Sequence, residues 1–393
     1  MWLLTKCLLF WCMLQSMLFW PTNFYSRPWL LILAALVLLI FNSKKWFATN
    51  IPIIGLLLAA LLLIADSIII NGIIPSLAIA VTYFTGICLF RLNDDRKKDL
   101  LQFVTKWFGI IIGISLGWYI IWLPIRFAPF GLLKNPFNYY DVYNFIFFVL
   151  PNTTTLITRF SGPFIEPGHL GMIAVFIIYA NKFNFKHNRY LWVILAAVLF
   201  SLSLAGYVLL ALAYLLHQGM GLKQILGGAI IAIGILYSVT NLWNNGDNPV
   251  NQKIVERLYY DEEKGISGNN RNLYSTELYF AKMIGDGRII WGLGNEQYTF
   301  LQKKKIIGGA GVTVYLIYNG IIGLILVFIY YAIIAWLGID RKYSIGFLLL
   351  ICFCFIQRAY PFWMAWLVPY ITSIYTQYKS TVSKQKYENR LYS

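Results

Sequence analysis

The segment from Arg159 to Gly171, RFSGPFIEPGHLG, holds the side chains best suited to chemistry in this sequence. A cation (Arg159), a carboxylate (Glu166) and a histidine (His169) stand directly before or at the start of an apolar run that predicts a helix. Proline is well tolerated in the first turn of a helix, so Pro167 predicts the helix start and places Glu166 at its mouth. The unpaired N–H groups there, together with Arg159, could hold a phosphate or pyrophosphate.

Each of these charged residues also has a structural explanation. Glu166 could merely complement the helix dipole, an effect of about 0.3–1 kcal/mol. Arg159 could be an interfacial arginine that faces lipid headgroups. The sequence leaves both explanations open beside the functional one.

The composition predicts an integral membrane protein. Of the 393 residues, 59% are apolar and only 12% are charged, whereas about a quarter of a soluble domain is charged. The net charge of +16 fits basic cytoplasmic loops and contact with anionic lipids. No nucleic-acid-binding motif accompanies this charge. The five cysteines lie in apolar segments and the three histidines are far apart, so neither a disulfide framework, a metal site nor a cofactor is predicted.

The apolar runs predict an all-α, polytopic fold of about twelve transmembrane helices, each long enough, with its flanks, to cross a hydrocarbon core of about 30 Å. Met1 to Trp20 is expected to be a retained first helix because no small-residue cleavage site follows it. The polar interruption from Ser201 to Tyr207 predicts that the long run 190–217 forms two short spans, although its small residues could also be helix-packing contacts. The predicted spans are about 1–20, 28–41, 51–70, 73–90, 103–123, 166–180, two within 190–217, 222–243, 308–337, 345–357 and 361–375.

Basic residues set the expected orientation. Lys44 and Lys45, and the cluster Arg91 to Lys98, mark cytoplasmic loops by the positive-inside rule. Both termini are then cytoplasmic, and two larger loops lie outside. In the first loop, the apolar patch Phe145 to Leu150 is expected in the membrane interface. In the second, Ser275 to Met283 predicts an amphipathic helix that buries Leu278, Phe280 and Ala281.

The expected organisation has six parts. They are the N-terminal transmembrane helices (1–123), an external loop with an interfacial segment (124–165), central transmembrane helices (166–243), a large external, periplasmic loop (244–305), C-terminal transmembrane helices (306–376) and a basic cytoplasmic tail (377–393).

In this arrangement the chain resembles the O-antigen polymerase and ligase superfamily of bacterial membrane glycosyltransferases, over roughly Arg159 to Leu326. Four features carry the resemblance: an arginine–glycine stretch with a helix-opening proline, a serine-rich helix break, an external loop with arginines and a Gly-x-Gly turn, and a Gly-Ile-Ile-Gly segment. Their residues are Arg159, Gly162 and Pro167; Ser201, Ser203 and Gly206; Arg257, Arg271, Gly292 and Gly294; and Gly320 to Gly323.

The resemblance implies a GT-C-like fold and polymerisation of undecaprenyl-pyrophosphate-linked oligosaccharide repeat units into surface polysaccharide. The active site would face the periplasm at the inner (plasma) membrane. Membrane lipids, the lipid-linked oligosaccharide and a chain-length regulator are the candidate partners. The resemblance implies that ligases of this superfamily carry a histidine just before the helix with the Gly-x-x-Gly, followed by an acidic residue near its glycines. Here the glycine run Gly308 to Gly311 takes that place and Asn319 precedes Gly320, which favours a polymerase.

Pyrophosphate is a good leaving group, so the enzyme chiefly needs cations where negative charge develops. Arginine grips two phosphate oxygens at once and stays charged. The predicted catalytic residues are Arg159, Glu166, His169 and Arg271, and the predicted substrate-binding residues are Arg257, Arg288, Gly162, Pro167, Gly292 and Gly294.

Some of these assignments have open alternatives. Each loop arginine could equally form a surface ion pair, worth about 0–1 kcal/mol. Glu277 and Glu296 are further general-base candidates beside Glu166 and His169. The pair Asp94–Asp95 lies on the predicted cytoplasmic side beside three basic residues, so it is rejected as a metal site and catalysis is predicted to be metal-independent.

Two other function classes remain as alternatives. A flippase or secondary transporter for lipid-linked oligosaccharide would suit twelve spans, but it should carry charges near the membrane midplane. Asp66 is the clear intramembrane acid, and it lies near the outer end of its span. The polar residues gather in two outer loops, which favours an external active site. The other alternative is a channel or a purely structural assembly subunit, and no pore-like repeat of charge or glycine supports it.

Overall fold

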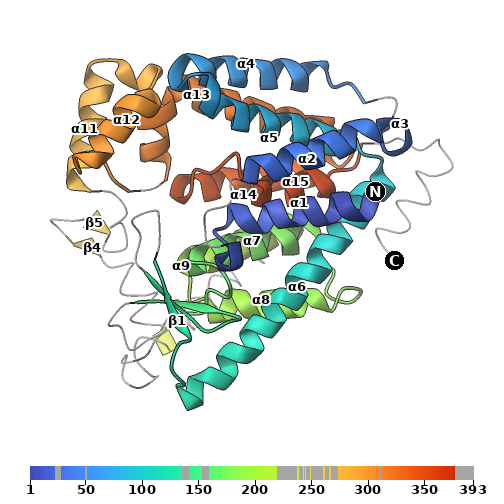
Figure 1. Ribbon diagram of the computed structural model, residues 1–393, viewed down its shortest axis with the longest axis vertical. Helices are drawn as coiled ribbons and strands as arrows, with labels where there is room; N and C mark the ends of the chain where they lie inside the picture. Colours follow the sequence, from blue (N-terminus) through green and yellow to red (C-terminus); the bar gives the residue numbers. More distant parts are fainter. Residues whose placement is uncertain are drawn as a thin grey trace.

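A computed structural model shows the arrangement of the chain (Figure 1). It describes residues 1–22, 28–48, 51–134, 141–152, 159–218, 273–309 and 311–376, with isolated positions between 237 and 266. Most of the predicted span 222–243 and the whole predicted tail 377–393 lie outside the described residues. Arg257 and Arg271 lie outside them too.

The described part of the chain is mostly helical. Within it, four helices are long and apolar enough to cross a membrane: α4 (Ile54–Asn71), α5 (Ile73–Arg91), α6 (Asp94–Ile125) and α13 (Val312–Leu337). Shorter helices occupy the other predicted spans there: α1 (Trp2–Ser16), α2 (Pro28–Phe41), α7 (Pro167–Ala180), α8 (Tyr190–Phe200), α9 (Leu204–Gln218), α14 (Arg341–Gln357) and α15 (Met364–Ser373). The chain is thus compatible with a membrane protein, and the total of twelve crossings stays a prediction.

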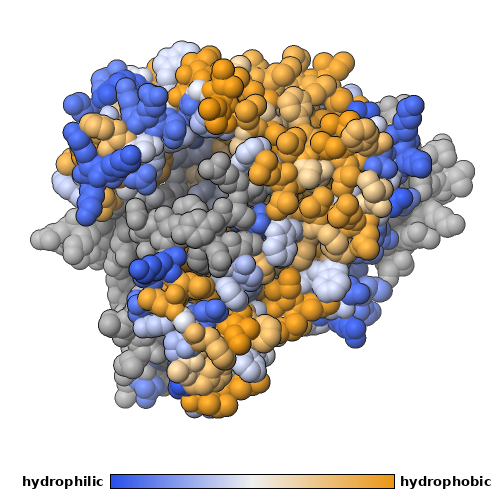
Figure 2. Space-filling view, in the orientation of Figure 1, coloured by the Kyte–Doolittle hydropathy of each residue, from blue (hydrophilic) through white to orange (hydrophobic). Residues whose placement is uncertain are grey.

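The surface of the helices is apolar, as contact with lipid requires. Figure 2 shows an orange region over the helices, with blue surface at α11 and α12 and again at the opposite end. Leucine and isoleucine side chains such as Leu58, Leu62 and Ile121 are exposed on this surface. Apolar side chains that face outward over a whole flank are costly in water, so this flank is suited to hydrocarbon.

A small antiparallel sheet lies where no strand was predicted, so the all-α expectation was incomplete. Its strands follow the order β1 (Gly131–Leu133), β2 (Val142–Asn144) and β3 (Val149–Pro151), and Tyr143 pairs with Leu150. Two further short strands, β4 (Tyr260–Asp261) and β5 (Gly265–Ile266), pair within the second loop.

The apolar patch Phe145 to Leu150 was expected in the membrane interface, but most of it is buried against the protein. The rings of Phe145 and Phe148 stack with centroids 4.8 Å apart, and both pack against Trp122 of α6. Phe148 is fully buried, whereas Ile146 and Phe147 are exposed. The aromatic rings gain contacts with α6 that a lipid interface would not supply.

The sheet also positions the segment before α7. The backbone N–H of Val149 donates to the carbonyl of Gly162, and the hydroxyl of Ser161 donates to the carbonyl of Val149 at 2.8 Å. On its other side this segment bonds the residues after α1, because Trp20 N–H donates to the carbonyl of Pro163. The predicted catalytic segment is therefore held between the sheet and the end of α1.

The first and last described residues meet at one end of the helical bundle. Trp2 and Lys6 of α1 both donate to the carboxylate of Asp99. Thr376 N–H donates to Asp94 at 3.1 Å. Helices α11 (Tyr274–Gly285) and α12 (Gly294–Lys303) and the β1–β3 sheet lie at the other end (Figure 1). The described parts of both larger loops thus lie away from the first described residues, and the side of the membrane on which they lie stays a prediction.

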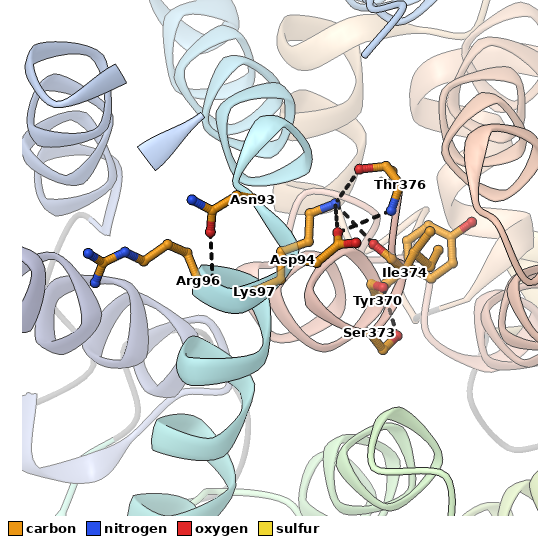
Figure 3. A network of polar contacts seen from close by, with 8 residues as sticks. All are labelled: Asn93, Asp94, Arg96, Lys97, Tyr370, Ser373, Ile374 and Thr376. Atoms are coloured by element: carbon orange, nitrogen blue, oxygen red, sulfur yellow. Dashed lines mark hydrogen bonds and ion pairs between the residues drawn. The ribbon is translucent and has the colours of Figure 1, made fainter. Parts of the chain in front are cut away.

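A fully buried lysine fastens α6 to the end of α15. Lys97 donates to the carbonyl of Ile374 at 3.0 Å and to the hydroxyl of Thr376 at 3.3 Å, and it lies 3.9 Å from Asp94 (Figure 3). Asn93 caps α6 by accepting from the N–H of Arg96. The buried ammonium is therefore compensated by two hydrogen bonds and a nearby carboxylate.

Two predictions about helices have different outcomes. The polar interruption divides the run 190–217 as expected, since α8 ends at Phe200 and α9 begins at Leu204. The amphipathic helix is present as α11, but its predicted buried face was only partly right, because Phe280 packs on the cluster around Met283 whereas Ala281 is exposed. Leu278 is 55% exposed, whereas Thr276 and Met283 are buried. Thr276 bonds Gly308, which turns that face toward the protein.

The contacts of Lys97 predict a stability effect. In Lys97→Ala the carbonyl of Ile374 and the carboxylate of Asp94 lose a buried charged partner, which typically contributes about 1.5–3 kcal/mol. We expect the thermal unfolding midpoint of the detergent-solubilised protein to fall. Lys98→Ala removes an exposed lysine next to it and is the control. Equal midpoints for the two variants would show that the Lys97 contacts are not stabilising.

Candidate functional site

The start of α7 is where the sequence placed it, but Glu166 has a different partner from the one expected. Pro167 is the first residue of α7, and Glu166 precedes it in an extended conformation. The Glu166 carboxylate makes no capping hydrogen bond to the helix. It accepts instead from the guanidinium of Arg358, in the turn between α14 and α15. The helix mouth thus holds an ion pair.

The ion pair is largely removed from solvent. The side chains of Arg358 and Glu166 are 10% and 16% exposed. Burial by itself lowers the pKa of Arg358, but the charge of Glu166 more than offsets this, so the pKa lies above its ordinary value. Gly168 leaves room for the guanidinium, since a Cβ there would lie 2.6 Å from its Nη2 atom. The cation and the carboxylate are therefore fixed against the first turn of α7.

His169 lies beside this pair, against an aromatic wall. Its Nε2 is 4.0 Å from the Glu166 carboxylate, and the residue is 2% exposed. The rings of Tyr360 and Trp363 stack with centroids 4.0 Å apart, and the imidazole meets both edge-on. The structure thus brings together the predicted pair of Glu166 and His169. Of these two, Glu166 is the more accessible to a substrate.

Arg159 lies at the break between α8 and α9. Its Nε donates to the carbonyl of Ser201 at 3.2 Å, and its charge acts on the phenol of Tyr207. Ser201 in turn contacts α7, because a Cβ on Gly171 would lie 3.8 Å from its hydroxyl. Gly168, beside Arg358, is one helical turn away from Gly171. Arg358 therefore lies against the first turn of α7, and Arg159 is linked to α7 indirectly, through Ser201.

Gly162 turns the chain between Arg159 and the helix. It adopts a φ of +58°, which favours glycine, and a Cβ there would lie 3.3 Å from the Ile112 side chain of α6. This geometry explains Gly162 by backbone conformation and close packing. Its predicted contact with substrate stays a prediction, as does that of Pro167.

The predicted Gly-x-Gly turn lies against other membrane helices. A Cβ on Gly292 would lie 2.5 Å from the backbone nitrogen of Gly320, where α13 is interrupted. A Cβ on Gly294 would collide with the carbonyl of Ile70 at the end of α4. Both glycines have positive φ. Close backbone contact accounts for them, and these contacts are with α13 and α4 rather than α7.

Arg288 forms the surface ion pair that was its alternative explanation. It lies in the short 3-10 helix η6 (Arg288–Ile290), and its Nε donates to Asp286 at 2.8 Å. This hydrogen bond lowers the pKa of Asp286 below its ordinary value. The Arg288 side chain is 43% exposed. The structure does not join Arg288 to the cluster at α7.

Arg358, Tyr360 and Trp363 were not among the predicted site residues. The residues from Gln357 to Pro361 were expected only to form an outer turn, and α14 does end at Gln357. A signal was present, because Arg358 is a lone cation at the end of an apolar run and the aromatic sequence Tyr-Pro-Phe-Trp comes soon after it. A charge at that position needs a partner, and the partner is 192 residues away in the sequence.

The buried ion pair at α7 predicts that the stability effects of substitutions at Glu166 and Arg358 are strongly coupled. Arg358→Met leaves the Glu166 carboxylate buried without its cation, and breaking a buried pair typically costs about 3–5 kcal/mol. The double variant Glu166→Gln/Arg358→Met removes both charges. We expect its thermal midpoint to lie above that of Arg358→Met. The matched control is Asp286→Asn/Arg288→Met, whose exposed pair should show almost no coupling. Additive losses at Glu166 and Arg358 would argue against the buried pair.

A substitution at Gly292 distinguishes a role in helix packing from a role in substrate binding. Gly292→Ala forces a Cβ against the backbone of α13 at a φ of +81°, and a non-glycine residue in that region costs roughly 1–2 kcal/mol before any collision. We expect a clear fall in the thermal midpoint. Gly285→Ala, where a Cβ would meet open space, is the control. If Gly292→Ala had the same thermal midpoint as Gly285→Ala but lost activity, substrate binding would be the better explanation of Gly292.

Comparison with known proteins identifies no relative that would assign a role to these residues. No protein-family model matches the chain, and no curated protein or solved structure matches it either. The functional argument therefore depends on the arrangement of Arg159, Glu166, His169 and Arg358 and on the sequence motifs around them.

Proposed function

We propose that this chain is a glycosyltransferase that polymerises undecaprenyl-pyrophosphate-linked oligosaccharide repeat units into surface polysaccharide, at the outer face of the bacterial plasma membrane. The observation that carries the proposal is the buried ion pair of Glu166 and Arg358 at the start of α7, with Arg159 bonded to the helix break whose Ser201 packs on the same helix. This cluster is at the end of the bundle opposite the first described residues. The resemblance to the O-antigen polymerase and ligase superfamily supports the same reaction.

The reaction needs negative charge to be stabilised as the sugar leaves its carrier. A hydroxyl of the acceptor sugar attacks the anomeric carbon of the donor glycan, the bond from that carbon to the pyrophosphate oxygen breaks, and the hydroxyl proton passes to a base. Arg159, Arg358 and the N–H groups at the start of α7 would bind the departing pyrophosphate. Preorganised cations of this kind need no reorganisation during the step.

Glu166 is the proposed base. Before substrate binds, its carboxylate is neutralised by Arg358. When a pyrophosphate binds Arg358, it replaces Glu166 as the partner of the guanidinium. Glu166 then loses its neutralising charge and becomes a better proton acceptor while the substrate is bound. A general base typically contributes about 10²–10⁴-fold to the rate. His169, held between Glu166 and the aromatic wall, would orient the carboxylate.

The test is a gel that separates the polysaccharide chains by length, as a ladder, from a strain that lacks the gene and carries one variant on a plasmid. We expect Arg159→Ala and Arg358→Ala to leave a single repeat unit on its acceptor, because losing one electrostatic donor costs about 10²–10³-fold in rate. Arg271→Ala tests the remaining predicted catalytic arginine. Arg288→Ala, which breaks only an exposed ion pair, should keep the full ladder. Immunoblots must show equal membrane levels of each variant.

The outcomes separate the alternatives. A full ladder from Arg159→Ala or Arg358→Ala would remove that arginine from the mechanism. If deleting the gene removed even the single repeat unit, polymerisation would give way to a flippase or a ligase. Arg358→Lys keeps the charge but not the planar fork, so a partial ladder from it would support bidentate phosphate binding over a purely structural role.

A further inference from the structure

An apolar groove runs between α8 and α9. Its volume is about 460 Å³, within the range of about 300–1,000 Å³ usual for ligand sites. The groove exists because both helices pack on α7 and scarcely on one another. Small residues explain the close α7–α9 contact, since Gly171 and Gly206 meet where a Cβ on Gly171 would lie 3.3 Å from the Gly206 Cα.

The groove is lined by one continuous face of α9. Tyr207, Leu210, Ala211 and Tyr214 all line it, and the spacing of i, i+3, i+4 and i+7 puts them on a single helical stripe. This stripe covers about 10 Å along the helix at 1.5 Å per residue. Leu199 lines the facing side on α8. The groove is thus elongated along the helices, with walls suited to a hydrocarbon chain.

The two ends of the groove differ in polarity. At the end near the α8–α9 break, the Tyr207 hydroxyl donates to the carbonyl of Leu199, and Arg159 Nε donates to the carbonyl of Ser201 at 3.2 Å. At the far end, Phe183 and Phe185 close the groove with aromatic rings. A ligand that matches both ends has an anionic head and a long apolar tail.

We propose that the groove binds the isoprenoid chain of the lipid-pyrophosphate substrate, with the phosphate next to the chain at Arg159. This inference rests on the proposed function and adds the location of the lipid part of the substrate. An isoprenoid pyrophosphate is favoured over a bulk phospholipid because the polar end of the groove, at Leu199, is two residues from Ser201, whose carbonyl accepts from the arginine that the proposed reaction uses. The chain then fixes the direction from which the pyrophosphate reaches α7.

The test is photolabelling of the purified full-length protein in nanodiscs. The probe is a polyprenyl pyrophosphate that carries a diazirine on its chain and no sugar, and labelled peptides are identified by mass spectrometry. We expect labels on α8 and α9, and competition by undecaprenyl pyrophosphate but not by phosphatidylglycerol. Ala211→Trp fills the groove and should lower labelling by about tenfold, equivalent to roughly 1.4 kcal/mol of binding.

Val208→Trp is the matched control, because Val208 is 56% exposed on the same helix but does not line the groove. Ala211→Phe, a smaller filling change, should give an intermediate loss. Equal labelling of Ala211→Trp and Val208→Trp would overturn the proposal, and so would equal competition by phosphatidylglycerol.

The ladder assay distinguishes failure of the lipid-groove proposal from failure of the proposed function. If Ala211→Trp loses the photolabel in the groove but deleting the gene leaves the polysaccharide ladder intact, the lipid site is supported and polymerisation is rejected. Conversely, a normal ladder from Ala211→Trp at low substrate supply would reject the groove and retain polymerisation. As a control for folding, Ala211→Trp must have the same thermal unfolding midpoint as Val208→Trp. If it does not, Ala211→Phe is used in place of Ala211→Trp.

Discussion

The buried ion pair between Glu166 and Arg358 is the interaction on which the candidate site depends. In a poorly solvated position neither charge is tolerated alone, so each holds the other in place. The pair fixes the first turn of α7 to the turn between α14 and α15. That contact in turn sets Trp363 against His169. One electrostatic constraint thus brings together chain segments that have no proximity in sequence.

The parts of this structure that could be predicted from the sequence are those with local causes. Pro167 opens α7 because a proline costs no hydrogen bond there. The serines after Phe200 interrupt the run because Ser201 donates to the carbonyl of Val198 and Ser203 accepts from the N–H of Gly206 at the start of α9. The lengths of the apolar runs were enough to predict the four long apolar helices of the described chain, α4, α5, α6 and α13. Glu166 and His169 were brought together correctly because both lie within one turn of the same helix.

The parts that could not be predicted depend on contacts between distant segments. Nothing near Arg358 in the sequence identifies Glu166 as its partner. The buried face of α11 is set by Gly308, which bonds Thr276 from outside the helix. Gly292 was predicted to bind substrate, yet its lack of a side chain is explained by the backbone of α13. Spacing alone cannot distinguish a glycine that admits a ligand from one that admits another helix.

The shortness of α8 and α9 has a consequence for the surrounding bilayer. With 11 and 15 residues, they are about 16 and 22 Å long at 1.5 Å per residue, well below a hydrocarbon thickness of about 30 Å. Trp192 and Val208 are exposed on these helices. Where helices this short cross a bilayer, local thinning of the membrane is one way in which the mismatch is relieved. Lipid headgroups beside α8 and α9 would therefore sit deeper than elsewhere around the protein, which shortens the path between the bilayer and Arg159.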